Sequence, residues 1–190
     1  MISAGATLTI NAGVTVSICG DYTNNGTLNA APTSTIQFIN PSAIQNINGS
    51  LTGANRFPNL LINKAGGSVV LNQNIDIAGS FTTTNNTSIF NTTGKSIRLA
   101  GNFSNNNGNV TFSNVGSGTL EFNGSAAQTF INSNGTITLN NVLMNHTGPG
   151  VTLNGTNSTL FIGTSGSLTL TLGKIITGTL EVNVLNSSPA

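Results

Sequence analysis

The side chains that could carry out acid–base or metal chemistry are few and widely spaced. The acidic residues are Asp21, Asp76, Glu121 and Glu181, and the single histidine is His146. Cleavage of a polysaccharide needs clustered carboxylates, with Ca²⁺ or a basic residue beside them. Because the first and last acids lie near opposite ends of the sequence, at most two acids are expected to meet on one face. The sequence therefore predicts a protein that is not an enzyme.

Comparison of the chain with itself weakens the case for an active site further. Asp21 is matched by Asn102, and Glu121 by Gln37, in two similar halves of the sequence. His146 lies in a turn-like segment with no second histidine to share a metal, so a surface position is favoured over a metal ligand or a general base. We predict no catalytic, cofactor-binding or metal-binding residue, and no cofactor.

Surface contact is the remaining role for individual side chains. Tyr22 and Phe103 occupy the same position of the two halves, and as outward residues they could stack on sugar rings. The alternating residues around them favour a core position instead. Outward Thr-x-Thr pairs include Thr169 and Thr171. The candidate surface-contact residues are therefore Tyr22, Phe103, Thr169 and Thr171.

A tandem repeat organises the elements that must position these residues. The stretch Gly20-Asp21-Tyr22-Thr23-Asn24-Asn25-Gly26 returns as Gly101-Asn102-Phe103-Ser104-Asn105-Asn106-Asn107-Gly108, and later segments match at a similar offset. We place module 1 at 20–100 and module 2 at 101–183, with 1–19 as the tail of a preceding module. Tandem modules of about 82 residues predict stacked structural units, here one continuous fragment over 1–190.

The composition indicates an ordered chain with weak electrostatics. Charged residues make up 5% of the sequence and the formal net charge is +1, whereas an ordinary domain has about 25% charged residues. Regularly spaced Ile, Val, Leu and Phe supply a core, which disordered chains lack. The five basic residues are scattered, which argues against nucleic acid as a partner. No apolar run reaches the roughly 20 residues that span a bilayer, so no membrane insertion is expected.

Alternation of apolar and polar residues predicts many short strands and essentially no helix. Asn-Gly pairs between the strands favour sharp turns. The alternating runs are 7–10, 14–18, 75–77, 96–99, 110–112, 136–139, 151–153, 167–172 and 180–184. An antiparallel sandwich and a parallel β-solenoid both suit this pattern. Because the strand–turn rhythm continues between the modules without a linker, the all-β parallel β-helix (β-solenoid) is favoured.

The expected solenoid has about three short strands per coil of roughly 20 to 27 residues, hence about seven to nine coils. At about 4.8 Å per coil the rod would be roughly 35 to 45 Å long. Asparagines at equivalent corners are expected to form hydrogen-bonded ladders. The apolar residues expected inside include Phe38, Phe112, Phe122, Phe130 and Phe161. The core is expected to be open at both ends.

The chain resembles a known class of repeat region. The stretch from Gly20 to Asn29, with Phe38, Gln45, Phe57-Pro58-Asn59-Leu60 and the segment 168–178, is similar to the Asn/Thr/Gly-rich repeats of very large secreted proteins of Bacteroidetes. The resemblance covers nearly all of the chain. It implies a β-helical stalk of a cell-surface, adhesin-like protein, exported by type IX secretion through a separate C-terminal signal. It implies an extracellular location and carries over no catalytic residue.

Three classes of function follow from these features. The favoured one is a non-enzymatic structural and adhesive segment, whose partners would be glycans or surfaces, neighbouring repeats, or further copies joined end to end. The chain starts in strand-like sequence without a signal peptide, so we expect it to be a piece of a longer protein. The alternatives are an ice- or crystal-surface-binding solenoid, which needs threonine pairs in register on one face, and a carbohydrate-binding or polysaccharide-degrading β-helix.

Overall fold

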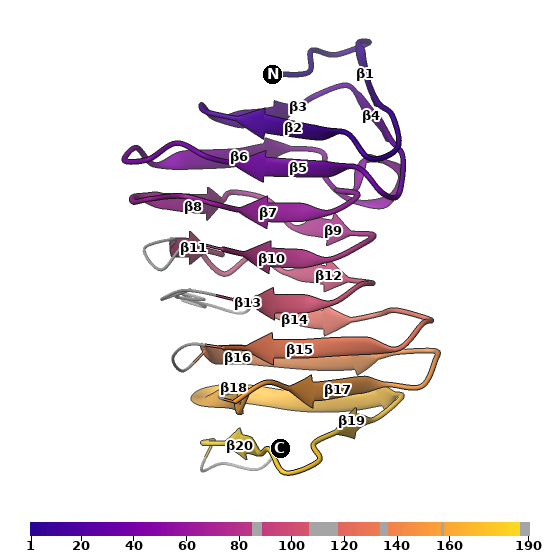
Figure 1. The fold of residues 1–190 in the computed structure, drawn as a ribbon, viewed down its shortest axis with the longest axis vertical. Helices are drawn as coiled ribbons and strands as arrows, with labels where there is room; N and C mark the ends of the chain where they lie inside the picture. Colours follow the sequence, from indigo (N-terminus) through magenta and orange to yellow (C-terminus); the bar gives the residue numbers. More distant parts are fainter. Residues whose placement is uncertain (85–88, 107–117, 134–136, 157, 187–190) are drawn as a thin grey trace.

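The structure is a parallel β-solenoid, as the sequence predicts. A computed structural model describes residues 1–84, 89–106, 118–133, 137–156 and 158–186. About seven turns of chain stack along one axis, with the N-terminus at one end and the C-terminus at the other (Figure 1). In the described part of the chain, the 3-10 turn η1 (Gly53–Asn55) is the only helical element.

Four parallel sheets make up the rod. Sheet 1 consists of β2 (Thr15–Ile18), β5 (Thr35–Phe38), β7 (Leu60–Ile62), β10 (Phe81–Thr83), β13 (Phe103–Asn105), β15 (Gln128–Asn132), β17 (Val151–Asn154) and β19 (Ile175–Ile176). Sheet 2 consists of β3 (Tyr22–Asn24), β6 (Gln45–Gly49), β8 (Ser68–Leu71) and β11 (Ile89–Asn91). Sheet 3 consists of β9 (Ile75–Ile77), β12 (Ile97–Leu99), β14 (Thr119–Phe122), β16 (Ile137–Asn145), β18 (Leu160–Leu172) and β20 (Val182–Val184), and sheet 4 of β1 (Thr7–Ile10) and β4 (Thr27–Ala30).

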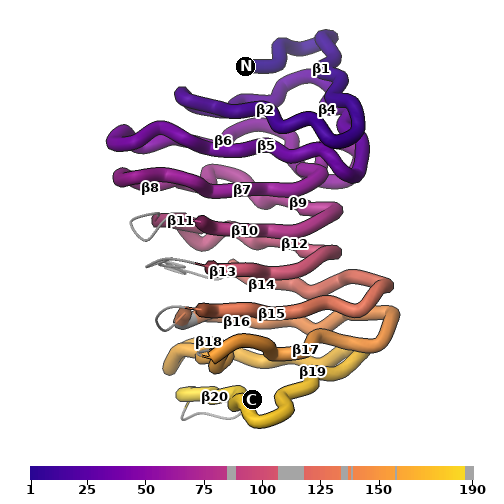
Figure 2. The backbone as a smooth tube through the Cα atoms, viewed as in Figure 1, coloured from indigo at the N-terminus to yellow at the C-terminus, as the bar shows by residue number. Residues whose placement is uncertain are grey.

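In the middle of the rod the chain visits the sheets in a fixed order. It runs from sheet 1 to sheet 2 and sheet 3 before returning to sheet 1, as in β7, β8, β9 and β10. Each turn lies directly against the next, and the tube in Figure 2 follows this single path from one end to the other. Paired residues are 20 apart between Val16 and Ile36 and 27 apart between Phe103 and Phe130, which are the extremes of the range. The predicted coil length is therefore confirmed.

A ladder of aromatic rings fills the centre of the rod. Phe81, Phe103 and Phe130 pair in register on β10, β13 and β15 and are fully buried. Their ring centroids lie 5.2 and 4.8 Å apart, with interplanar angles of 29° and 16°. Such offset stacking stabilises by about 1 kcal/mol per pair beyond the burial of apolar area. Beside this ladder, Asn105 Nδ2 donates to Asn132 Oδ1 at 2.8 Å, and Thr83 Oγ1 donates to Asn105 Oδ1 at 2.7 Å, so polar side chains are hydrogen-bonded across three coils.

The predicted core is largely correct, with one error. Phe38, Phe122 and Phe130 are buried as expected, and Phe112 lies outside the described residues. Phe161 is half-buried, and its neighbours Leu160 and Ile162 are buried instead. Because successive side chains of a strand point to opposite faces, Phe161 faces away from the core. The prediction of an inward Phe161 was therefore wrong.

The two modules are turned relative to each other around the rod. Tyr22 lies on β3 of sheet 2, whereas its equivalent Phe103 lies on β13 of sheet 1. In the same way β5 belongs to sheet 1, and its equivalent β14 belongs to sheet 3. The repeat is therefore not a whole number of coils, and β13 and β14 of module 2 each sit one sheet earlier in the order of travel than their counterparts β3 and β5. A given face does not present the same residues twice.

Glycine is required at the corners for two different physical reasons. Gly49 has a φ of 95°, which side chains other than glycine rarely adopt. Gly26 and Gly101 need glycine because of close packing: a Cβ would lie 2.3 Å from Ala6 O and 2.4 Å from Gly79 O, respectively. The Asn-Gly and Gly signals in the sequence thus mark both left-handed turns and corners where successive coils touch.

Candidate functional site

Three charged residues form a column on sheet 3. Asp76 on β9, Arg98 on β12 and Glu121 on β14 are direct partners in register on three successive coils. Arg98 Nε donates to Glu121 Oε2 at 3.1 Å, and Arg98 Nη1 lies 3.8 Å from Asp76 Oδ2. The fold thus brings together three of the nine charged side chains of the sequence. We call these three residues the charged column.

Both carboxylates of the column also accept hydrogen bonds from residues outside the column. Asp76 is only 8% exposed, and its Oδ2 accepts a hydrogen bond from Gly53 N at 2.8 Å. Glu121 Oε1 accepts from Asn145 Nδ2 at 2.9 Å. Among the described residues, the buried Asp76 Oδ1 has no hydrogen-bond partner. The Arg98 side chain is 50% exposed, so the guanidinium is the most accessible part of the column.

A groove of about 440 Å³ runs along the column. Its walls come from five successive coils, and the residues beside the charged column include Thr52, Ser96, Thr119 and Leu143. Leu143 pairs with Glu121 and Thr169 pairs with Leu143. The exposed Thr169 therefore continues the charged column beyond the groove, whereas Thr171, also exposed, lies on the same strand outside this register.

The two acids that share a face do not form an open catalytic pair. Asp76 and Glu121 are two coils apart, which is about 10 Å along the axis, and Arg98 lies between them. Glycosidases leave the space between their two carboxylates free for the sugar and water. Here a guanidinium occupies it. Within the described ranges, no three His, Cys, Asp or Glu side chains come together as metal ligands, and no helix is long and apolar enough to cross a membrane.

The aromatic candidates for surface contact lie in the core. Tyr22 is 3% exposed and Phe103 is fully buried, so neither ring offers a face to a sugar. Tyr22 packs against Phe57 with ring centroids 5.4 Å apart. Tyr22 Oη is buried without a hydrogen-bond partner in the described structure. The favourable free energy of burying the apolar ring therefore outweighs the cost of burying the hydroxyl group. The same burial raises the pKa of Tyr22 to about 12. These two residues are therefore removed from the set of contact candidates.

His146 is an interior residue, and the prediction of a surface histidine was wrong. It is 1% exposed, its Nε2 lies 2.9 Å from Ala126 O, and Gly148 N donates to its Nδ1 at 3.0 Å. The neutral ring with its proton on Nε2 makes both hydrogen bonds. The side chain thus joins one coil to the preceding one and is not placed for catalysis at the surface.

Lys64 occupies the position of module 1 that corresponds to His146, and sequence reasoning missed it. It is fully buried, and its Nζ donates to Asn40 O at 2.6 Å, Ala43 O at 2.9 Å and Gln45 Oε1 at 3.0 Å. Ala43 corresponds to Ala126, so both side chains bind the same carbonyl of the preceding coil. Burial lowers the pKa of Lys64. The repeat was the signal in the sequence that could have pointed to Lys64, because Lys64 lies one module before His146.

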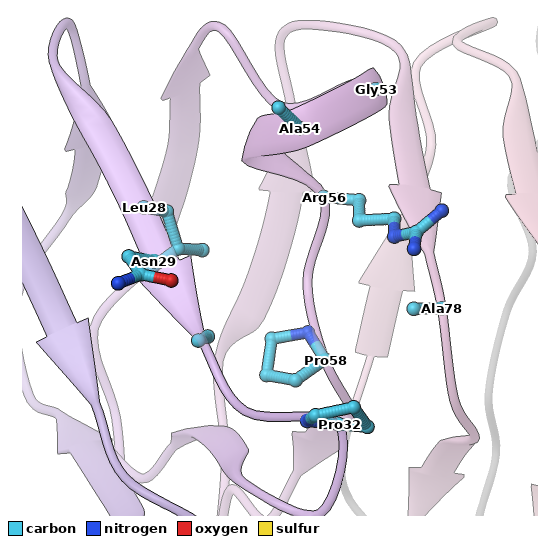
Figure 3. Close-up of a pocket in the computed structure, with 9 residues that line it drawn as sticks. Leu28, Asn29, Pro32, Gly53, Ala54, Arg56, Pro58 and Ala78 are labelled. Carbon is cyan, nitrogen blue, oxygen red and sulfur yellow. The ribbon is translucent and has the colours of Figure 1, made fainter.

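A second depression, of about 300 Å³, lies at the corner between β4 and η1. Figure 3 shows Arg56 extending from the segment after η1 toward Ala78, with Pro32 and Pro58 forming an adjacent wall. Arg56 is exposed, and among the described residues its side chain makes no ion pair with a carboxylate. This depression therefore holds a single charge and no converging set of polar groups.

The described threonine pairs do not form one flat array. Thr7 and Thr9 lie on β1 of sheet 4, whereas Thr169 and Thr171 lie on β18 of sheet 3. Thr136 and the side chain of Thr138 are outside the described residues. A flat ice-binding face needs such pairs in register on one sheet. The charged column and its groove are thus the candidate site with the most converging groups.

Comparison with known proteins adds no relative to this picture. No protein-family model matches the chain, and neither curated proteins nor solved structures give a significant match.

Proposed function

We propose that this chain is a stiff, non-enzymatic structural and adhesive segment of an extracellular bacterial surface protein. Its polar faces would make weak, repeated contacts with glycans or surfaces. The resemblance to Bacteroidetes repeat regions leads to the same proposal, including export to the cell surface. One observation carries it: the coils pair in parallel register from one end of the rod to the other, over a continuous core.

Stiffness follows from this pairing by elementary mechanics. Bending the rod would stretch backbone hydrogen bonds on one side and compress packed side chains on the other, and interiors packed as densely as crystals resist both. A rod of this kind holds whatever lies at its ends at a fixed distance. About seven coils at about 4.8 Å each give a spacer of roughly 34 Å. Tandem modules would extend it without a flexible joint.

Adhesion by many weak contacts depends steeply on the surface density of the adhesive chain. Several weak contacts acting together bind far more strongly than one contact alone. Beads coated with the chain at graded densities should therefore adhere to glycan-coated surfaces steeply above a threshold density. Beads that carry the heat-unfolded chain are the control. Tight binding of one small molecule, or release of reducing ends from a polysaccharide, would contradict the proposal.

A further inference from the structure

The charged column is not required by the solenoid, because the matching positions one repeat length earlier carry no charge. By the repeat, Arg98 corresponds to Ser17 and Glu121 to Gln37. Ser17 and Gln37 are also direct partners in register, on β2 and β5. The matching positions of adjacent coils, one repeat length earlier, are thus filled by uncharged residues. The fold accepts either pair, so the charges of Arg98 and Glu121 need another explanation.

Polar groups of the column have hydrogen-bonding capacity left over. Asp76 Oδ1 is buried at the groove without a partner among the described residues, although an unsatisfied buried acceptor normally costs about 1–3 kcal/mol. A guanidinium has five N–H donors, and the structure gives Arg98 one short hydrogen bond, from Nε to Glu121. Its contact with Asp76, at 3.8 Å, is an ion pair and not a hydrogen bond. Because Asp76 Oδ1 itself is shielded from solvent, the groove offers a ligand the unused N–H donors of Arg98 and, as an acceptor, the carboxylate of Glu121, whose side chain is 14% exposed.

The groove has the shape of a site for an extended chain. It spans five coils along the rod, which is about 19 Å at the spacing of parallel strands, and its volume is about 440 Å³. The half-buried Leu143 adds apolar surface at the end nearest Glu121. A ligand that lies here runs parallel to the rod axis and crosses the charged column.

We propose that this groove binds a neutral oligosaccharide strand along the rod axis. Sugar hydroxyl groups both donate and accept, so one ligand can donate to the carboxylate of Glu121 and accept from the guanidinium of Arg98. The column carries two acidic groups and one basic group, and its formal charge of about −1 disfavours polyanions such as uronic-acid chains. The inference rests on the proposed adhesive function and assigns one of its contacts to a defined site.

Titration of neutral tetra- to hexasaccharides into the chain, followed by NMR shifts and calorimetry, tests this site. Arg98→Gln combined with Glu121→Gln should weaken binding about tenfold or more, because charge-assisted hydrogen bonds are lost. The double change leaves a polar pair of the Ser17–Gln37 kind, so the fold should persist, and far-UV spectra would verify this. Arg56→Gln removes another exposed arginine, which lies outside the groove, and should leave the affinity unchanged.

Three results would overturn the site. These are unchanged affinity in the double variant, shifts confined to residues outside sheet 3, and binding of uronic-acid oligomers in preference to neutral ones. If no oligosaccharide of the set binds, the groove proposal also fails. Bead adhesion of the unaltered chain is measured separately. Adhesion without binding in the groove refutes the site alone, whereas loss of both refutes the adhesive function as well.

Discussion

The two modules solve the same packing problem with different residues. Lys64 in module 1 and His146 in module 2 both bind the carbonyl of the matching alanine one coil earlier, at 2.9 Å in each case. Gln45 and Gln128 make the same contacts in the two modules: each side-chain amide donates to two carbonyl groups of the preceding coil. The fold therefore fixes which backbone groups must be satisfied at a corner. It does not fix the residue that satisfies them.

The charged column shows the opposite behaviour. Its counterpart one repeat length earlier, the pair Ser17 and Gln37, keeps the strand register but provides no charge. A contact that recurs in both modules belongs to the scaffold, and one that occurs once is free to serve function. Internal repetition thus separates structural from functional residues within a single sequence. Each prediction below tests this separation.

The largest effect is expected at the centre of the aromatic ladder. Phe103→Ala removes a ring stacked between Phe81 and Phe130 and should lower the free energy of unfolding by about 3–5 kcal/mol, as deletions of buried aromatic rings do. Tyr22→Ala should cost clearly less. Tyr22 has no stacked ring on either side in the described structure, and its deletion also removes an unsatisfied hydroxyl group. Denaturant unfolding followed by circular dichroism measures both. Equal losses would show that stacking adds nothing.

Substitutions of Lys64 and His146, which occupy matching corners of the two modules, should have the next largest effect. Lys64→Ala and His146→Ala remove a buried side chain together with its hydrogen bonds to the preceding coil, so each should cost about 2–3 kcal/mol. Lys64→His and His146→Lys should each cost about 1 kcal/mol less than the alanine change, because the new side chain is the one that the other module uses. The exposed Lys174→Ala is the matched control and should stay within about 0.5 kcal/mol. Thermal unfolding of the five variants provides the comparison.

If the exchanged variants were no more stable than the alanine variants, the two corners would not be equivalent. The shared carbonyl contact would then be a coincidence of geometry. The separation of scaffold from functional residues would lose its clearest example.

Much of the fold could be read from the sequence because strand periodicity and turn residues are local signals. The alternation around Phe103 and the constant offset between the modules predict stacked parallel coils and buried rings. The rotation of module 2 by one sheet could not be predicted. Coil length changes with the length of the turns, so the sequence offset specifies which residues correspond but not their angle around the axis.

The candidate site was missed for the same reason. Asp76, Arg98 and Glu121 follow one another at the local coil length, and that spacing would have placed them in one column. The local coil length is known only once the register is known. His146 was misplaced because polar residues in a turn usually face water, and only its hydrogen bonds to the adjacent coil explain why it is inside.

A smaller effect at neutral pH, which grows at alkaline pH, is expected at the aromatic position of module 1. Tyr22→Phe removes a buried hydroxyl group without a described partner and should stabilise the chain by about 1 kcal/mol at neutral pH. Burial raises the pKa of Tyr22 to about 12 from 10.0. Between these values the folded state keeps a proton that the unfolded state loses, so stability falls as the pH rises from 10 to 12. The Tyr22→Phe variant should escape this loss.

The size of the alkaline effect follows from the shift. One pKa unit corresponds to about 1.4 kcal/mol, so the gap between the two chains should widen by up to about 2–3 kcal/mol by pH 12. Lys64, whose pKa is lowered by burial, acts in the opposite direction: its contribution to stability increases as the pH rises toward 10.5. Lys64 is present in both the unaltered chain and the Tyr22→Phe variant, so its effect cancels from the difference between their stabilities. If the difference in stability between the unaltered chain and the Tyr22→Phe variant stayed constant from pH 8 to 12, ionisation of Tyr22 would not contribute to that difference.

The smallest effect is expected at Asp21, which the repeat matches with the uncharged Asn102. Asp21 Oδ1 accepts from Asn46 N at 2.7 Å, and Asn102 Oδ1 accepts from Thr129 N at 2.9 Å, so both side chains satisfy a backbone donor of the following coil. Asp21→Asn keeps this acceptor and should change stability by less than about 0.5 kcal/mol, whereas Asp21→Ala should cost about 1 kcal/mol. Unfolding of both variants at low and high salt distinguishes a hydrogen bond from a charge effect. A loss in Asp21→Asn as large as in Asp21→Ala would mean that the negative charge itself matters, and Asp21 would then join the charged column among the residues that the scaffold does not explain.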